Sequence, residues 1–194
     1  MNHQRARFSP HIHTHFDAIA ERLEEERAPV EQLSAALPHF VALMSEASRL
    51  GLFTIQPGSE NYTRAPLYVH RSERFSLYGI AWAPGQWTPV HDHGTWGLVG
   101  VVQGQIHELN YHRHPSAEGD ERIHLSPSGV TVLSPNAINS FLDEPDHIHK
   151  TGVPSDGAPA WSLHLYGRHM SSYFSYDVER GTRALLEVEA GTPE

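Results

Sequence analysis

The 194-residue sequence contains no cysteine, a single lysine (Lys150) and no long run of apolar residues. The absence of cysteine excludes disulfides, zinc–thiolate sites, iron–sulfur clusters and a cysteine nucleophile. No apolar run approaches the ~18 residues that a membrane span needs, and the polar N-terminus is not followed by the apolar core of a secretory signal. We therefore expect a cytoplasmic protein without a membrane partner.

Basic residues are also scarce, because 14 Lys and Arg stand against 23 Asp and Glu, which gives a net charge of −9 with neutral histidines. Such an acidic chain repels phosphate backbones, which argues against a nucleic-acid partner. Histidine, in contrast, is abundant, with 16 residues. In a chain without cysteine, imidazole is the only plentiful nitrogen ligand, so the composition favours a histidine-bound metal.

The ends of the chain differ in texture from its middle. Residues 1–15 are polar, and we expect a flexible N-terminus there. From Phe16 apolar residues recur at helical spacing, which predicts a helical section over residues 16–51. Pro38 is expected to begin a new helix rather than to kink one, and Gly51 closes the section. Residues 178–194 read as an acidic C-terminal tail.

The region from about residue 59 to 177 consists of short runs rich in aromatic and β-branched residues, separated by proline and glycine. Many short strands with turn residues between them are typical of an antiparallel sandwich or barrel. The sequence therefore predicts one all-β domain over residues 16–177, with the helical section at its start. The expected strands are 75–83, 98–103, 105–112, 122–126, 130–133 and 160–166.

The most informative stretch, residues 84–104, reads PGQWTPVHDHGTWGLVGVVQG. On a strand, His91 and His93 project from one face and Asp92 from the other. Gly85 and Gly104 frame the pair, and this pattern resembles the first motif of the cupins. The resemblance implies a double-stranded β-helix, that is, a jelly-roll barrel. Cupins commonly carry a glutamate about four residues after the second histidine, whereas residues 95–98 here read TWGL.

Two further segments offer polar side chains at strand spacing. Residues 146–150 read DHIHK, so His147 and His149 share a face, and periodicity alone does not choose between them as a third ligand. Residues 161–167 read WSLHLYG, which places Ser162, His164 and Tyr166 on one face of a strand. That face turns either into the barrel, where the polar groups need partners, or toward solvent. His11, His13 and His15 also alternate, but we interpret them as solvated.

The segments HDHGTWG, DHIHK and SLHLYG, in this order and spacing, resemble the thiol dioxygenases, which include cysteine dioxygenase and a bacterial relative, 3-mercaptopropionate dioxygenase. The resemblance runs from about Asn61 to Tyr166. It implies Fe(2+) held by three histidines, a small mercapto-carboxylic acid and O₂ as substrates, and a sulfinate as product. It also selects His149 over His147 as the partner of His91 and His93.

The same resemblance implies a relay of Ser162, His164 and Tyr166. Some family members crosslink this tyrosine to a cysteine, which cannot occur in this chain.

The residues expected to bind the substrate resemble two different branches of the family. Tyr62 and Arg64 lie in a stretch similar to that in cysteine dioxygenase, whose arginine binds the substrate carboxylate. Arg168, two residues after Tyr166, is a rival for that carboxylate if the alternation of the strand continues. The sequence around the first motif is more similar to that of the mercaptopropionate branch, which has glutamine in place of Arg64. The preferred thiol therefore stays open among cysteine, 3-mercaptopropionate and mercaptosuccinate, as does the oligomeric state.

Two other classes of function fit a histidine-rich cupin. One is a cupin that binds a metal and a small ligand without turnover, against which the Ser-His-Tyr relay argues. The other is a zinc or manganese isomerase or hydrolase, because three histidines and a water also make a competent zinc site.

Overall fold

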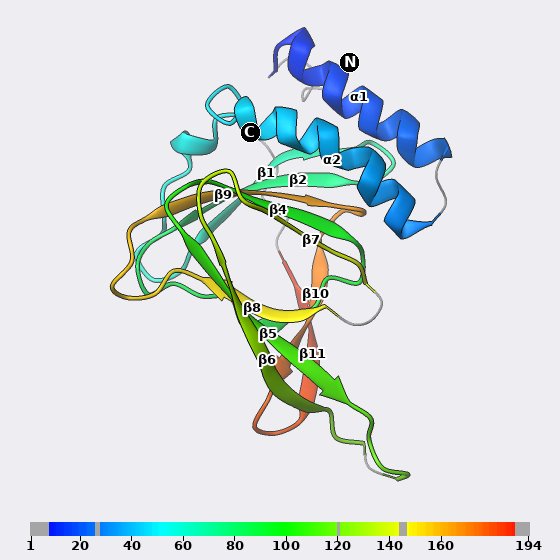
Figure 1. Cartoon of the computed structure of the whole chain (residues 1–194), viewed down its shortest axis with the longest axis vertical. Coiled ribbons are helices and arrows are strands. Elements are labelled where there is room, and N and C mark those ends of the chain that lie inside the picture. The colour runs from blue at the N-terminus through cyan, green and yellow to red at the C-terminus, as the bar shows by residue number, and fades with distance from the viewer. Residues whose placement is uncertain (1–7, 26–27, 120, 144–146, 189–194) are drawn as a thin grey trace.

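The computed structural model describes residues 8–25, 28–119, 121–143 and 147–188. Two helices, α1 (Pro10–Glu25) and α2 (Pro29–Ser45), and a short 3-10 helix, η2 (Leu52–Thr54), precede the strands. The strands form two antiparallel sheets that face each other, with both helices outside the barrel against one of them (Figure 1). This is the cupin architecture that the sequence predicts, with its helical section at the N-terminus.

One sheet has five strands in the order β1-β2-β9-β4-β7, and the other has six in the order β11-β10-β3-β8-β5-β6. The five-stranded sheet consists of β1 (Thr63–Val69), β2 (Ser76–Trp82), β9 (Ala160–Tyr166), β4 (Gly97–Gln103) and β7 (Ile138–Phe141). The six-stranded sheet consists of β11 (Thr182–Glu187), β10 (Ser172–Asp177), β3 (Val90–His91), β8 (Ile148–Gly152), β5 (Ile106–His114) and β6 (His124–Leu133).

Helix α1 begins at Pro10, six residues before the expected start at Phe16. The apolar stripe continues backward, because Ile12 is buried together with Phe16, Ile19 and Leu23. Residues 10–15 are therefore helical rather than flexible, and their three histidines lie on a helix. Residues 1–7 of the expected flexible N-terminus lie outside the described residues.

Pro38 lies inside α2, contrary to the expectation that it begins a helix. Pro29 occupies the start of α2 instead, where a missing backbone N–H costs nothing. The single hydrogen bond that Pro38 removes is outweighed by packing, since Phe40, Leu43 and Met44 are buried against the five-stranded sheet.

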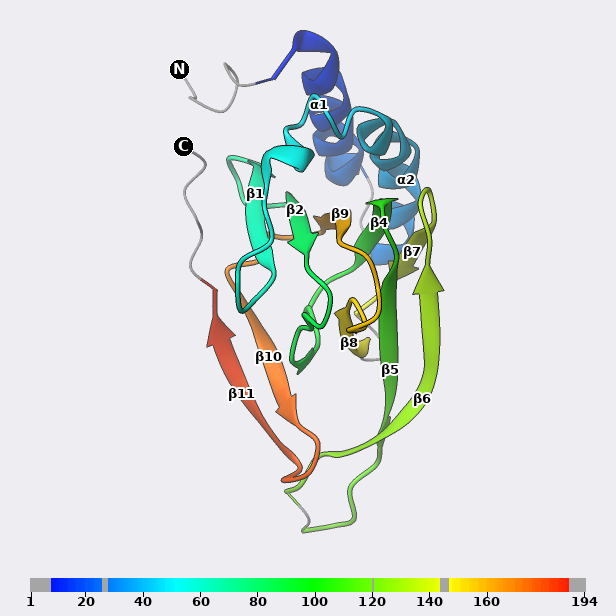
Figure 2. The same ribbon diagram turned by 90° about the vertical axis from the view of Figure 1, so that its left-hand side faces the viewer.

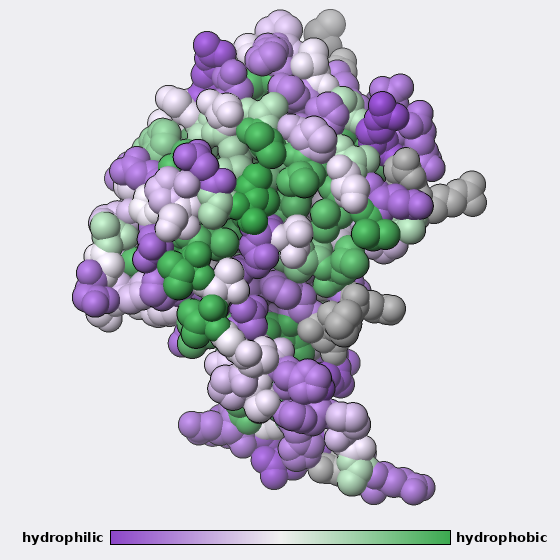
Figure 3. All heavy atoms as spheres, viewed as in Figure 1, coloured by the Kyte–Doolittle hydropathy of each residue, from purple (hydrophilic) through white to green (hydrophobic). Residues whose placement is uncertain are grey.

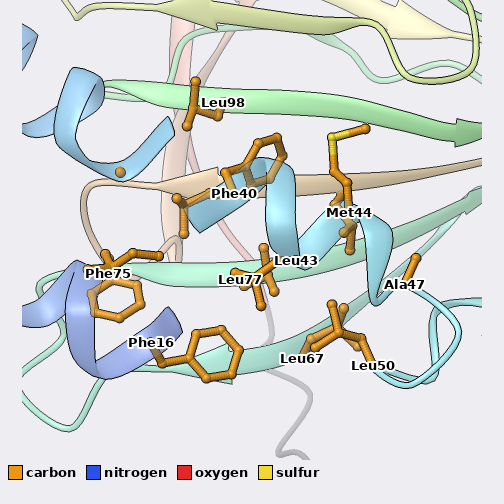
Figure 4. Close-up of a cluster of buried hydrophobic side chains, with 14 of the residues drawn as sticks. Phe16, Phe40, Leu43, Met44, Ala47, Leu50, Leu67, Phe75, Leu77 and Leu98 are labelled. Atoms are coloured by element: carbon orange, nitrogen blue, oxygen red, sulfur yellow. The ribbon is translucent and has the colours of Figure 1, made fainter. Parts of the chain in front are cut away.

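The main hydrophobic core fills the space between the helices and the five-stranded sheet (Figure 4). Leu163 and Leu165 of β9 belong to this core, so the opposite face of β9 must turn into the barrel. Gly100 of β4 permits the close packing of α2, because a Cβ there would overlap the side chain of Met44. The helices thereby fix which face of β9 lines the interior.

Strand β6 continues through Pro127 and Gly129, where the sequence predicts a break between two strands. The edge position of β6 in the sheet explains this, because an edge strand needs ladder hydrogen bonds on one side only. The register of β5 with β6 shifts between Asn110 and Tyr111, so that Ser128 of β6 has no partner, and this accommodates the irregularity.

The segment expected to be an acidic tail contains β11, which pairs with β10 from Thr182 to Glu187. Gly181, with a φ of 65°, closes the turn between the two strands. Leu185 and Leu186 of this strand remain exposed. Residues 189–194 of the expected tail lie outside the described residues.

Two long hairpins, β5–β6 and β10–β11, extend below the barrel at opposite edges of the six-stranded sheet (Figure 2). Ile123 donates a backbone hydrogen bond to Gly181 and so joins the two hairpins near their ends. The surface of this extension is mostly hydrophilic, whereas apolar side chains gather on the upper body (Figure 3). Among the described residues, no helix has both the length and the apolarity that crossing a membrane requires.

Candidate active site

Three histidines meet inside the barrel. His91 ends β3, His93 follows it by two residues, and His149 lies directly across from His91 in the register of β3 with β8. Each ring offers a nitrogen, and these atoms all lie within 4.8 Å of one another. In the described part of the chain, this is the one group of three or more histidine or acidic side chains with metal-ligand spacing.

The chemistry of these nitrogens fits a divalent metal ion. His91 donates its Nδ1–H to the Pro89 carbonyl at 3.0 Å, so its Nε2 carries a lone pair. His93 Nδ1 and His149 Nε2 are buried without a hydrogen-bond partner. Burial lowers the pKa of His91 and of His149 to about 3, and that of His93 well below 6.5. Neutral imidazoles with unpaired lone pairs are the form of histidine that binds metals.

His147, the alternative that strand periodicity leaves open, stands beside this group rather than in it. Its ring stacks on Phe141 with a centroid separation of 4.3 Å, and its centroid lies 6.0 Å from that of His93. The loop before β8 thus turns His147 toward an aromatic neighbour, while His149, inside the strand, points into the barrel.

The polar face of β9 also lines the barrel interior. Ser162 Oγ lies 2.8 Å from His164 Nε2, and His164 Nδ1 lies 3.2 Å from the Tyr166 hydroxyl. Trp82 on the neighbouring strand donates its indole N–H to Ser162 Oγ at 2.9 Å. The three side chains that alternate in sequence therefore form a connected, buried chain of hydrogen bonds, which resolves the question of whether this face meets solvent.

Burial sets the protonation of this chain of groups. It lowers the pKa of His164 to about 3, and the nearby positive charge of Arg64 acts in the same direction. It raises the pKa of Tyr166 well above 10, although Arg64 opposes that shift. His164 is therefore a neutral imidazole and Tyr166 a neutral phenol at neutral pH.

The pocket above the histidines takes its walls from both sheets. Arg64 lines it and is held in place by a hydrogen bond from Nη2 to the Met170 carbonyl at 2.8 Å. The guanidinium carbon of Arg64 lies 3.5 Å from the centre of the Tyr78 ring. Tyr62 also lines the pocket. The remaining lining residues are Ile80, Trp82, Thr88, His91, His93, His149, Thr151, His164, Tyr166, Met170 and Tyr173.

Arg168 lies away from this lining, in contrast to its expected inward position. Its Nε and Nη2 donate to the His93 carbonyl at 3.1 and 2.9 Å, and Nη2 also reaches the Ser172 carbonyl at 2.5 Å. The reason is that β9 ends at Tyr166, so strand alternation does not extend to position 168. Arg168 instead joins the loop after β9 to the segment that carries His93.

Two polar residues close to the histidine cluster, Tyr173 and Glu108, are absent from the sequence-based expectations. Tyr173 of β10 faces His91, with 5.1 Å between ring centroids. Glu108 of β5 is fully buried, and burial raises the pKa of its carboxyl group. A lone glutamate in an alternating strand has no distinguishing signal, and β10 lies in a segment where no strand is expected.

The buried relay makes a prediction about acid stability. The His164 pKa is lower in the folded than in the unfolded protein, so below pH 6.5 the unfolded state binds more protons. The free energy of unfolding then falls as the pH falls, by up to about 1.4 kcal/mol per pH unit from this residue, until about pH 3. Replacing His164 by Gln should remove this contribution. Urea unfolding of the metal-free wild type and variant at about pH 5 and about pH 6 measures it. If the free energy of unfolding changes between the two pH values by the same amount in both proteins, the assignment is contradicted.

The sheets and the histidine cluster together define the class of this protein, a cupin with an interior site for a metal ion. The sequence profile described as "Cysteine dioxygenase type I" matches residues 17–179, which is more than half of the chain. The chain therefore belongs to the cysteine dioxygenase type I family.

Individual relatives are distant. The chain is similar to cysteine dioxygenase type 1 of Danio rerio, with 27% identity over 123 residues. The match covers 62% of this chain and spans 58% of the length of that relative. Among solved structures, a protein with a cupin-like fold from Ralstonia eutropha has a TM-score of 0.45 and 14% identity, with 68% of each chain covered. A cupin-2 domain protein from Rhodospirillum rubrum has a TM-score of 0.42 and 15% identity, also with 68% of each chain covered.

Proposed function

We propose that this protein is a thiol dioxygenase that converts a small mercapto-carboxylic acid and O₂ to the corresponding sulfinate, with Fe(2+) held by His91, His93 and His149. The observation that supports it most is the meeting of three different groups in one pocket. These are a cluster of neutral histidines, a buried hydroxyl relay and a guanidinium. Metal binding alone does not require the other two.

The three ligands are neutral, so a divalent ion among them keeps its full charge and attracts an anionic thiolate. When bound, ferrous iron supplies the activation of O₂ and of the thiolate. The overall conversion, R–SH plus O₂ to R–SO₂H, places both oxygen atoms on sulfur and needs no other reductant.

Arg64 binds the substrate carboxylate in this proposal. A guanidinium offers planar pairs of N–H donors that match a carboxylate, and one backbone carbonyl uses only part of that capacity. The contact with Tyr78 fixes the plane of the guanidinium beneath the pocket. Tyr62 lines the same pocket, and Ile80 and Met170 add apolar surface that limits the access of water.

The relay positions the Tyr166 hydroxyl over the site. Ser162 accepts from Trp82, so its own hydroxyl proton is free to point at His164 Nε2. His164 then carries its proton on Nδ1 and donates it to the Tyr166 oxygen. This leaves the phenol proton to be donated into the pocket, toward the substrate. Because burial raises the pKa of Tyr166, it acts as a hydrogen-bond donor and not as a phenolate.

O₂ uptake by the iron-loaded protein tests the proposal. The metal-free protein is loaded anaerobically with Fe(2+), and O₂ consumption and sulfinate formation are followed with cysteine, 3-mercaptopropionate and mercaptosuccinate. We expect one O₂ consumed and one sulfinate formed per thiol with at least one of the three. Arg64 favours cysteine, because the corresponding position of the mercaptopropionate branch is glutamine.

The zinc-loaded protein is the matched control, since zinc occupies the same ligands without redox chemistry. It should bind thiols without consuming O₂. If the iron-loaded protein consumes no O₂ with any of these thiols, the proposed function is wrong. A metal- and ligand-binding cupin without turnover, or a zinc or manganese enzyme, then becomes the better interpretation.

A further inference from the structure

Glu108 is a buried carboxylate next to the histidine cluster that the proposed reaction does not use. It lies on β5, directly across from Thr151 in the register with β8, and His149 is two residues from Thr151 on the same face. Its side chain is 0% exposed, and among the described residues it is the only buried acidic side chain. It therefore lies inside the barrel, on the side of the His149 ring that faces away from His91 and His93.

The surroundings of Glu108 leave one of its oxygens without a hydrogen bond. Asn139 of the opposite sheet donates its Nδ2–H to Glu108 Oε2 at 2.5 Å. Oε1 has no hydrogen bond and lies 3.3 Å from His149 Nδ1. A buried carboxylate with a single neutral donor is destabilising unless a positive charge lies nearby. His149, itself a neutral imidazole, is the only basic side chain that the described residues place within ion-pair distance of it.

A metal ion on the far side of His149 would complete this arrangement. A neutral imidazole carries one ring proton, and His149 Nε2 is the buried nitrogen without a partner. Binding of a cation at Nε2 requires the proton at Nδ1, which faces Glu108 Oε1 and, at 3.2 Å, Thr151 Oγ1. A carboxylate in this place fixes the orientation and tautomer of a ligand histidine and makes it a stronger donor.

The position of Glu108 also bears on the glutamate ligand that the first cupin motif of this chain lacks. The cupin glutamate expected about four residues after His93 is missing, because residues 95–98 are Thr, Trp, Gly and Leu. The ligand set is consequently neutral, and the ionised form of Glu108 places one negative charge just outside it. A carboxylate there balances part of the metal charge without occupying a coordination position.

We propose that Glu108 is a positioning residue that acts through His149, holding its proton on Nδ1 and supplying from outside the ligand set the negative charge that a ligand glutamate would otherwise bring. This inference rests on metal binding by the three histidines in the proposed function, and it is independent of thiol oxidation.

Glu108→Gln tests the inference with a side chain of nearly equal size. Asn139 donates toward the Oε2 position, so it should hold the oxygen of the new amide there and direct the amide N–H₂ at His149 Nδ1. That contact favours the tautomer with the proton on Nε2, which leaves Nε2 without the lone pair that a metal in the cluster needs. We expect Co(2+) binding, followed by absorption, to weaken by about 10- to 100-fold. We also expect the Fe(III)/Fe(II) midpoint potential to rise, because lost negative charge disfavours the ferric state.

Glu108→Asp is the matched control, because it keeps the charge and shortens the side chain by one methylene. It should retain a potential closer to wild type than Glu108→Gln does, whereas a purely structural role predicts that the shorter side chain is at least as harmful. Co(2+) affinity within about twofold of wild type in Glu108→Gln, together with an unchanged potential, would overturn the inference.

A measurement on the unaltered chain keeps the test decisive if Glu108→Gln fails to fold. Proton–nitrogen NMR of the zinc-loaded protein should show a slowly exchanging His149 Nδ1–H, and coordination through Nδ1 would refute the inference. The two proposals fail separately. If Glu108→Gln weakens Co(2+) binding and the iron-loaded wild type consumes no O₂, the role of Glu108 stands and the dioxygenase function is wrong. If Glu108→Gln leaves Co(2+) binding and the potential unchanged and the wild type consumes O₂, the dioxygenase function stands and the role of Glu108 is wrong.

Discussion

Replacing His149 by alanine is expected to abolish both metal binding and thiol-dependent O₂ consumption. The variant keeps two of the three ring nitrogens that meet in the barrel, and it removes the one that comes from β8. Loss of a direct ligand should exceed the 10- to 100-fold effect that is typical of outer partners, so we expect metal affinity to fall by about 10³-fold or more. Equilibrium dialysis against Fe(2+) under anaerobic conditions and an O₂ electrode measure the two losses.

His147→Ala is the matched control, since it removes a histidine two residues away in the same segment. His147 packs on Phe141 and lies outside the ligand group, so its loss should reduce stability modestly and leave at least one metal per chain bound. A protein that loses its metal through His147→Ala and keeps it through His149→Ala would contradict the assignment of the third ligand. The pair thus decides a choice that strand periodicity leaves open.

Replacing Arg64 by Gln is expected to weaken the binding of thiols that carry a carboxylate. A charge-assisted, two-point contact with a carboxylate contributes about 1.5–3 kcal/mol, so kcat/KM for the preferred mercapto acid should fall by about 10- to 100-fold. The loss should appear mainly in KM, because Arg64 contacts the end of the substrate that does not react. Steady-state O₂ uptake over a range of thiol concentrations measures it.

Two controls isolate the carboxylate in this experiment. The first is 2-mercaptoethanol, which has a thiol and no carboxylate, and whose kcat/KM should be the same in wild type and in Arg64→Gln. The second is Arg71→Gln, which removes a guanidinium from an exposed position outside the pocket. If Arg64→Gln lowers kcat/KM equally for both kinds of thiol, the carboxylate binds elsewhere. The geometry disfavours Arg168 as the replacement, because its donors already bond to backbone carbonyls.

Those parts of the site that depend on local periodicity were predictable from the sequence. His91 and His93 share a face because residues two apart on a strand project the same way. The same rule grouped Ser162, His164 and Tyr166, and the hydrogen bonds among them follow from that spacing. Residues that act within one strand need no knowledge of the rest of the fold.

Residues that act across strands were not predictable in this way. Glu108 reaches His149 only because β5 pairs with β8 in one register, and Asn139 reaches Glu108 only because the two sheets face each other. Tyr173 enters the pocket because β10 pairs with β3, in a part of the chain where no strand is expected. For Arg168, local periodicity predicted an inward position that the structure does not show. Strand β9 ends two residues before it, and its side chain donates to the backbone carbonyl of His93.

The sequence by itself determined the class of the protein, the first two histidines and the order of the relay, because each is written in residue types at short spacing. Tertiary structure decided which side of β9 faces inward, since Leu163 and Leu165 are drawn outward by the helices that cover the sheet. It also placed one buried carboxylate behind the third histidine. Contacts between distant segments depend on strand register and sheet closure, and neither leaves a local pattern in the chain.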